Sequence, residues 1–63
     1  MTKVLIVEDE IVLSTLLCAQ LEKLDYQVAG VAQSGELAIE MADQTLPDLI
    51  LMDIMMPFYE EMS

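Results

Sequence analysis

Acidic side chains follow two of the apolar segments of this 63-residue chain at the point where each segment ends. Glu8 and Asp9 come directly after residues 4–7, and Asp53 comes directly after residues 49–52. Carboxylates that are crowded together repel one another, which either raises their pKa values or recruits a cation. A site with few carboxylates and several waters suits Mg²⁺ among the divalent cations that prefer oxygen ligands. The spacing therefore indicates a cation site, although any single one of these acids could be a solvated strand cap.

The segments around these acids alternate between strand and helix patterns. Residues 4–7 form a continuous apolar run, which is typical of a strand buried on both faces of a parallel sheet. Leucines recur at helical spacing between residues 13 and 24, and Ser34 is predicted as the N-cap of a second helix that Pro47 ends. Two further apolar segments, residues 26–31 and 49–52, are predicted as strands. The resulting order β-α-β-α-β predicts an α/β fold with a parallel sheet.

The strand order determines where the acids meet. Because crossover connections are right-handed, placing the most apolar strand in the centre gives the order 2-1-3 with one helix on each face. Ligands of open parallel sheets bind beyond the carboxyl ends of the strands, where the strand order reverses. We therefore expect Glu8, Asp9 and Asp53 to converge on one crevice. The same order leaves the third strand as an unpaired edge.

The charge of the chain restricts its partners. Twelve acidic residues stand against two lysines, which gives a net charge of −10, yet 56% of the residues are apolar. Without a cationic surface, nucleic acid and anionic membrane surfaces are excluded as partners. No segment resembles an export signal or is long enough to span a bilayer, so a cytoplasmic protein is expected.

The length of the chain points to self-association. Chains of about 60 residues are marginally stable alone and usually need a disulfide, a metal or a partner. Cys18 is the single cysteine and cannot form an intrachain disulfide. The helix over residues 11–21 carries no charge, which favours either a long core helix or burial against another subunit or a missing segment. We expect a homodimer or a higher homo-oligomer.

The acids and their sequence context resemble the receiver domain of two-component response regulators. The resemblance covers about residues 3 to 57, and the segments that carry it are residues 4–10 (VLIVEDE), 34–38 (SGELA) and 47–57 (PDLILMDIMMP). It implies the N-terminal half of a flavodoxin-like fold and a role in a phosphorelay. It does not imply an enzyme.

The resemblance also implies a role for each acid. Asp53 would be the phosphoacceptor, receiving the phosphoryl group from a histidine kinase, a phosphotransfer protein or a small phosphodonor. Asp9 would bind Mg²⁺ directly, and Glu8 would act mainly through water. Asp53 and the backbone carbonyl of Met55 would complete the protein ligands of the metal.

The chain also differs from the family pattern. Receivers of this family have five βα units, whereas residues 1–63 are expected to form one truncated unit that stops after the third strand. The family's Ser or Thr after the fourth strand and its Lys after the fifth are absent, and neither Lys3 nor Lys23 matches that lysine by position. Two hypotheses follow: a phosphorelay receiver reduced to its acidic half, and a self-associating half-domain that acts as a non-catalytic interaction module. Under both, a twofold partner would pair with the third strand or cover the open helix faces.

Overall fold

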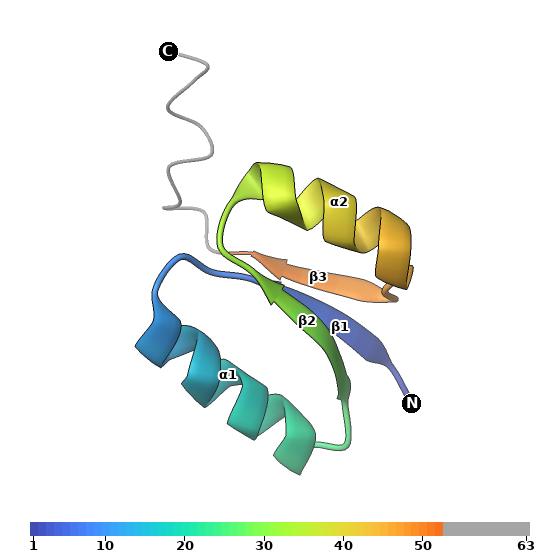
Figure 1. The fold of residues 1–63 in the computed structure, drawn as a ribbon. Helices are drawn as coiled ribbons and strands as arrows, with labels where there is room; N and C mark the ends of the chain where they lie inside the picture. Colours follow the sequence, from blue (N-terminus) through green and yellow to red (C-terminus); the bar gives the residue numbers. More distant parts are fainter. Residues whose placement is uncertain (53–63) are drawn as a thin grey trace.

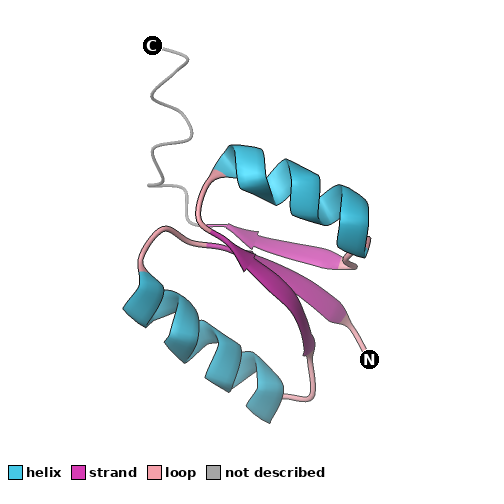
Figure 2. Cartoon of the chain, in the orientation of Figure 1, coloured by secondary structure: helices cyan, strands magenta, loops and turns pink. Residues whose placement is uncertain are grey.

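The computed structural model of the chain describes residues 1–52, in which three strands alternate with two helices (Figure 1). The elements are β1 (Lys3–Val7), α1 (Ile11–Lys23), β2 (Gln27–Ala32), α2 (Gly35–Thr45) and β3 (Leu49–Met52). The strands form one parallel sheet of order β2-β1-β3, and the helices lie on its two opposite faces (Figure 2). The predicted α/β class, strand order 2-1-3 and single helix on each face are confirmed. The predictions for Asp53 and Met55 fall outside the described residues.

The central position of β1 follows from its apolar run. Val4, Leu5, Ile6 and Val7 are all buried: β2 and β3 pair along the two sides of the strand, and α1 and α2 both contact it from the faces of the sheet. The pairing with β3 is regular, whereas the pairing with β2 shifts register between Val4 and Leu5. A strand flanked in this way satisfies its backbone on both sides and its side chains on both faces.

The face of the sheet under α2 carries a compact core. Leu5, Val7, Ala32 and Ala38 form a buried cluster, and Met41, Ala42 and Met52 pack against it. The small side chains of α2 let the helix approach the sheet closely. At Gly30 of β2, the terminal methyl group of Met41 occupies the space that a Cβ atom would take, so a larger residue there would require the end of this flexible side chain to move.

The other helix, α1, is incompletely buried. The leucine spacing predicts one stripe from Leu13 to Leu24, but Leu17 and Leu21 are half-buried whereas Leu13, Leu16 and Leu24 are exposed. A helix that is apolar most of the way round has no polar face to mark its outside, so its position over the sheet decides which leucines are buried. Among residues 1–52, no helix is long and apolar enough to cross a membrane.

A side chain caps the start of α2, whereas a residue after each helix adopts a left-handed backbone conformation. Ser34 caps α2 as predicted, since its hydroxyl accepts a hydrogen bond from the Leu37 N–H at 3.1 Å. At the other end of α2, Leu46 adopts φ 50°, and Asp25 adopts φ 67° in the turn after α1. Both lie in the left-handed region that favours glycine, so both positions carry backbone strain.

Hydrogen bonds of Lys3 connect the start of β1 to the residues just before β3. The Lys3 N–H donates to Asp48 Oδ2 at 2.7 Å, and the Asp48 N–H donates to the Lys3 carbonyl at 2.8 Å. The Lys3 Nζ also donates to the Thr45 carbonyl at 2.7 Å. Lys3 therefore lies at the amino end of the sheet, whereas Glu8 and Asp9 follow the carboxyl end of β1.

Candidate functional site

The carboxyl ends of β1 and β3 lie side by side. Val7, the last residue of β1, pairs with Met52, the last residue of β3. Glu8 and Asp9 follow β1 directly, and Asp53 follows β3 in the sequence. The structure thus places Glu8 and Asp9 together at this edge of the sheet, while the position of Asp53 lies outside the described residues.

Glu8 is held firmly at the end of β1. Its side chain is only 3% exposed, and its backbone N–H donates to the Ala32 carbonyl of β2 at 2.9 Å. Its Oε2 accepts a hydrogen bond from the Asp9 N–H at 3.0 Å. These contacts fix the orientation of the Glu8 carboxylate and tie the backbone of Asp9 to it.

The two acids have different access to solvent. Asp9 is exposed, so its carboxylate is accessible to a hydrated cation, whereas Glu8 is buried beside it. Oxygen donors of this kind suit a hard divalent cation such as Mg²⁺. In residues 1–52 no group of three or more possible metal-ligating side chains is found. The donor set of Glu8 and Asp9 fits a cation that needs at least one further ligand from elsewhere.

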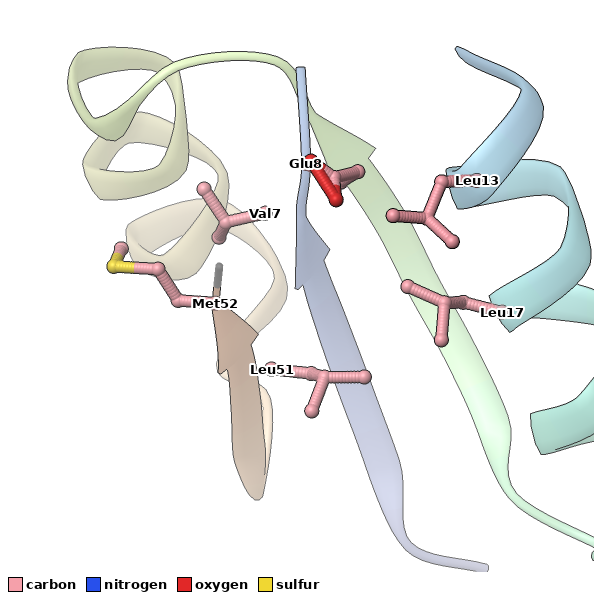
Figure 3. A pocket seen from close by; sticks show the side chains of 6 residues that line it. All are labelled: Val7, Glu8, Leu13, Leu17, Leu51 and Met52. Carbon is pink, nitrogen blue, oxygen red and sulfur yellow. The ribbon is translucent and has the colours of Figure 1, made fainter. Parts of the chain in front are cut away.

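An apolar pocket adjoins Glu8 on the α1 side of the sheet (Figure 3). Its volume is about 360 Å³, and its lining residues are Val7, Glu8, Leu13, Leu17, Leu51 and Met52. Leu13 and Leu17 extend from α1 toward the sheet, and Leu51 extends from β3 toward α1, whereas Met52 points to the opposite side (Figure 3). The Glu8 carboxylate therefore borders a cavity that is otherwise almost entirely apolar.

Sequence reasoning assigned these leucines to a helix stripe and a strand, and it did not predict the pocket between them. A second pocket of about 230 Å³ continues along β3, and Val4, Leu21 and Leu49 are among its lining residues. The signal that could have located both pockets is the combination of a helix without charge from Ile11 to Leu21 and a third strand that is apolar on both faces. One helix of this length cannot cover three strands, so an apolar gap over β3 was implied.

Comparison with known proteins identifies the family. Residues 4–60 match the response regulator receiver domain. The transcriptional regulatory protein YdfI of Bacillus subtilis is 45% identical over 58 residues, which cover 90% of this chain and 27% of YdfI. The transcriptional regulatory protein PdtaR of Mycobacterium tuberculosis is 40% identical over 55 residues, which cover 87% of this chain and 27% of PdtaR. The chain spans about a quarter of the length of these relatives.

A solved structure agrees with the family match. The signal receiver domain of a modulated diguanylate cyclase from Desulfovibrio desulfuricans G20 superposes with a TM-score of 0.85 and 45% sequence identity. The alignment covers 89% of this chain and 45% of that chain. The fold is accordingly half of a flavodoxin-like receiver, and the chain belongs to the response regulator receiver domain family of two-component signal transduction.

Proposed function

We propose that this chain is a phosphorelay receiver unit in which Asp53 accepts a phosphoryl group. The observation that supports the proposal is the register of β3, because Met52 pairs with Val7 and β3 therefore ends beside Glu8 and Asp9. In the sequence, Asp53 is the next residue after this pair. A carboxylate at that position would share its surroundings with the acid pair.

The reaction is an attack of a carboxylate on phosphorus. An oxygen of Asp53 forms a bond to the phosphorus atom of the donor, and the bond from phosphorus to the donor's leaving group breaks with its electron pair. The products are an aspartyl phosphate and the released leaving group, for example acetate from acetyl phosphate. This is one modification per chain and not a catalytic turnover, in keeping with the family's role as non-catalytic signalling modules.

Glu8 and Asp9 are the residues that would hold Mg²⁺, together with Asp53 and the backbone carbonyl of Met55. When bound, the cation supplies positive charge against the phosphoryl oxygens. The hydrogen bond from the Asp9 N–H to Glu8 Oε2 holds the Glu8 carboxylate against the backbone of Asp9 and so orients one of the two acids. A preorganised site of this kind lowers the reorganisation that accompanies phosphoryl transfer.

The proposal is tested by incubating the whole chain with acetyl phosphate and Mg²⁺ and measuring its intact mass. We expect one phosphoryl adduct in the parent chain and none in Asp53→Asn. Asp48→Asn is the matched control, because Asp48 is an acid at the amino end of β3, with its carboxylate bonded to the Lys3 N–H. The adduct should persist in that control.

Two results would contradict the proposal. An adduct that persists in Asp53→Asn would assign the modification to another residue. A complete lack of adduct in the parent chain, under conditions that phosphorylate a full-length receiver, would favour the non-catalytic module. The natural donors implied by the family are a histidine kinase or a phosphotransfer protein, and they belong to the same proposal.

A second function, self-association as an interaction module, is favoured by one specific observation. All four residues of β3 are apolar, yet the side chains of Leu49, Ile50 and Leu51 are each about half exposed to solvent. An apolar edge strand of this kind is a template for pairing with another chain. We propose that the chain forms a homodimer.

Sedimentation of the whole chain at several concentrations tests the homodimer. We expect a dimer that dissociates on dilution. A folded monomer throughout the micromolar range would contradict self-association and leave the phosphoacceptor proposal untouched, since the mass measurement depends on Asp53 alone.

A further inference from the structure

The residues of β3 do not by themselves determine how the strand aligns with β1. All four residues, Leu49 to Met52, are apolar, as are their four partners in β1. A slip of the pairing by one residue moves every side chain to the other face of the sheet, so an alternation of polar and apolar residues fixes the register of many strands. In β3 such a slip would only exchange one apolar side chain for another on each face.

Packing gives the observed register little advantage over a slipped one. Met52 packs against the buried cluster under α2, whereas Leu51 extends toward α1 (Figure 3). A slip of one residue would place Leu51 against the buried cluster in place of Met52. An exchange of leucine and methionine conserves volume and costs little in a core. The register of β3 therefore depends on contacts outside the strand itself.

Asp48, the residue immediately before β3, makes such a contact. Its backbone N–H donates to the Lys3 carbonyl at 2.8 Å, and its Oδ2 accepts from the Lys3 N–H at 2.7 Å. One residue thus pairs with both backbone groups of Lys3, the first residue of β1. Because the aspartate side chain is short, the two bonds form together in only one alignment of the strands.

The Asp48 carboxylate supplies an acceptor that the backbone does not offer. In a parallel pair, the N–H and C=O of one residue bond to two different residues of the neighbouring strand. The Lys3 carbonyl already bonds to residue 48, so a regular ladder would direct the Lys3 N–H to the carbonyl of residue 46. Leu46 lies outside β3 and adopts a left-handed conformation. Asp48 Oδ2 takes the place of that carbonyl.

Resting on the phosphoacceptor function proposed above, we propose that Asp48 is the positioning residue that sets the register of β3 on β1 and so aligns Asp53 with Glu8 and Asp9. In the sequence, β3 is the whole of the segment between Asp48 and Asp53. A slip of one residue would move the end of β3 by about 3.3 Å and reverse the face on which the next side chain lies. Asp48 itself touches no reacting group.

Contacts between side chains, measured by nuclear Overhauser effects in the whole chain, report the register. In the parent chain Met52 should contact the buried cluster under α2, and Leu51 should contact the leucines of α1. Asp48→Ala removes the acceptor, and we expect a folded chain with a second set of contacts in which Met52 faces α1. Asp48→Asn should show the parent contacts alone, because its amide oxygen still accepts from the Lys3 N–H.

The initial rate of adduct formation with acetyl phosphate and Mg²⁺ connects the register to the proposed function. Removing a hydrogen bond to a charged acceptor shifts the ratio of two states by about tenfold or more, so the rate in Asp48→Ala should fall at least about twofold. The fall should match the fraction of chains in the slipped register. Asp48→Asn should restore the parent rate.

Lys3→Met is the matched control at the other side of the contact. It removes the bond from Lys3 Nζ to the Thr45 carbonyl but keeps the backbone groups that Asp48 binds. Its side-chain contacts in β3 and its rate of adduct formation should be those of the parent chain. A slipped register in this variant would assign the effect to the lysine side chain and contradict the role of Asp48.

Insertion of one alanine between Asp48 and Leu49 is a second test, in which Asp48 stays intact. If Asp48 sets the register, the rest of β3 shifts by one residue, and Leu51 takes the place of Met52 against the buried cluster. Contacts of Met52 with the cluster that survive the insertion would show that the end of the strand sets the register. That result would overturn the proposal.

The outcomes separate the register from the phosphoacceptor itself. Parent contacts alone in a folded Asp48→Ala chain would overturn the proposal, as would a slipped register with an unchanged rate. Failure of Asp48→Ala or of the insertion variant to fold would show that the chain tolerates only one register, and would overturn it too. A slipped register in Asp48→Ala, with no adduct in the parent chain, would overturn the phosphoacceptor function while the effect of Asp48 on the register stands.

Discussion

The central strand β1 and the edge strand β3 have the same kind of sequence but opposite surroundings. In β1 the residues from Val4 to Val7 are 0–3% exposed, whereas Leu49, Ile50 and Leu51 in β3 are 54%, 50% and 43% exposed. Both strands are continuous apolar runs, the pattern of a strand that is covered on both faces. Within residues 1–52, β3 thus has the composition of an inner strand and the position of an edge strand.

The first prediction uses the contrast in burial directly. Leu5→Ala removes a fully buried side chain from the core under α2 and should lower the free energy of unfolding by about 3 kcal/mol. Leu51→Ala is the matched variant in β3. In dilute solution, where the chain is a monomer, the Leu51 side chain buries little apolar area, so this variant should lower the free energy of unfolding by less than about 1 kcal/mol. Urea unfolding followed by circular dichroism measures both. Equal losses would contradict the contrast between the strands.

The second prediction concerns the ends of the two strands. If Glu8, Asp9 and Asp53 share a cation, Mg²⁺ should raise the free energy of unfolding by about 1.4 kcal/mol at ten times its dissociation constant. Thermal melts with and without Mg²⁺ measure the effect. Asp9→Asn should remove it.

The matched control for the Mg²⁺ effect is Glu10→Gln. Glu10 is an exposed neighbouring acid, and its side chain makes no capping hydrogen bond to α1. The response to Mg²⁺ should therefore persist in this variant. An equal loss in both variants would indicate a nonspecific effect of charge, and an unchanged midpoint in the parent chain would reject a formed site.

The third prediction concerns the pairing of β3 with a second copy of the chain. A tenfold rise in protein concentration favours each association event by about 1.4 kcal/mol. Because one association stabilises two chains, dimerisation should raise the free energy of unfolding by about 0.7 kcal/mol per chain for each tenfold rise. Leu51→Lys should abolish the concentration dependence by placing a charge on the edge strand. Leu24→Lys, an exposed leucine after α1, is the control that should retain it. Concentration dependence that survives in Leu51→Lys would place the interface elsewhere.

The smallest expected effect lies in the turn that leads into β3. Leu46 has φ 50° and is 76% exposed, so Leu46→Gly relieves strain without losing packing and should stabilise the chain by about 0.5 kcal/mol. Asp25→Gly, at φ 67°, should gain less, because aspartate tolerates this conformation better than leucine. Thermal unfolding compares the two. Destabilisation by Leu46→Gly would contradict the assignment of strain.

Much of this fold was predictable because the relevant signals are local. The apolar run of residues 4–7 predicts a central strand, and the Ser34 hydroxyl predicts the cap that α2 shows. The positive φ at Leu46 was not predictable, since leucine gives no signal for a left-handed conformation. The neighbouring residues are consistent with a helix that ends here: Pro47 disfavours the right-handed helical conformation at Leu46, and Lys3 Nζ binds the Thr45 carbonyl.

The candidate site was predictable in part for the same reason. The positions of Glu8 and Asp9 follow from the end of β1, and the structure places them together. The pocket beside Glu8 was not predicted, because it depends on which leucines of α1 face the sheet, and this helix carries no charge from Ile11 to Leu21. That choice is made by packing between α1 and the strands, and a helix without a polar face does not encode it locally.

The most direct test of the account is amide hydrogen exchange along β3 in the unmodified chain. The Asp48 N–H donates to the Lys3 carbonyl of β1, and backbone groups alternate in direction along a strand, so the N–H groups of Ile50 and Met52 also point toward β1. These two amides should be protected at every concentration at which the chain is folded. Leu49 and Leu51 direct theirs toward the open edge, so we predict that their protection rises with protein concentration as the second copy pairs with β3. Exchange of Leu49 and Leu51 at the unprotected rate, at concentrations where sedimentation reports a dimer, would contradict the account.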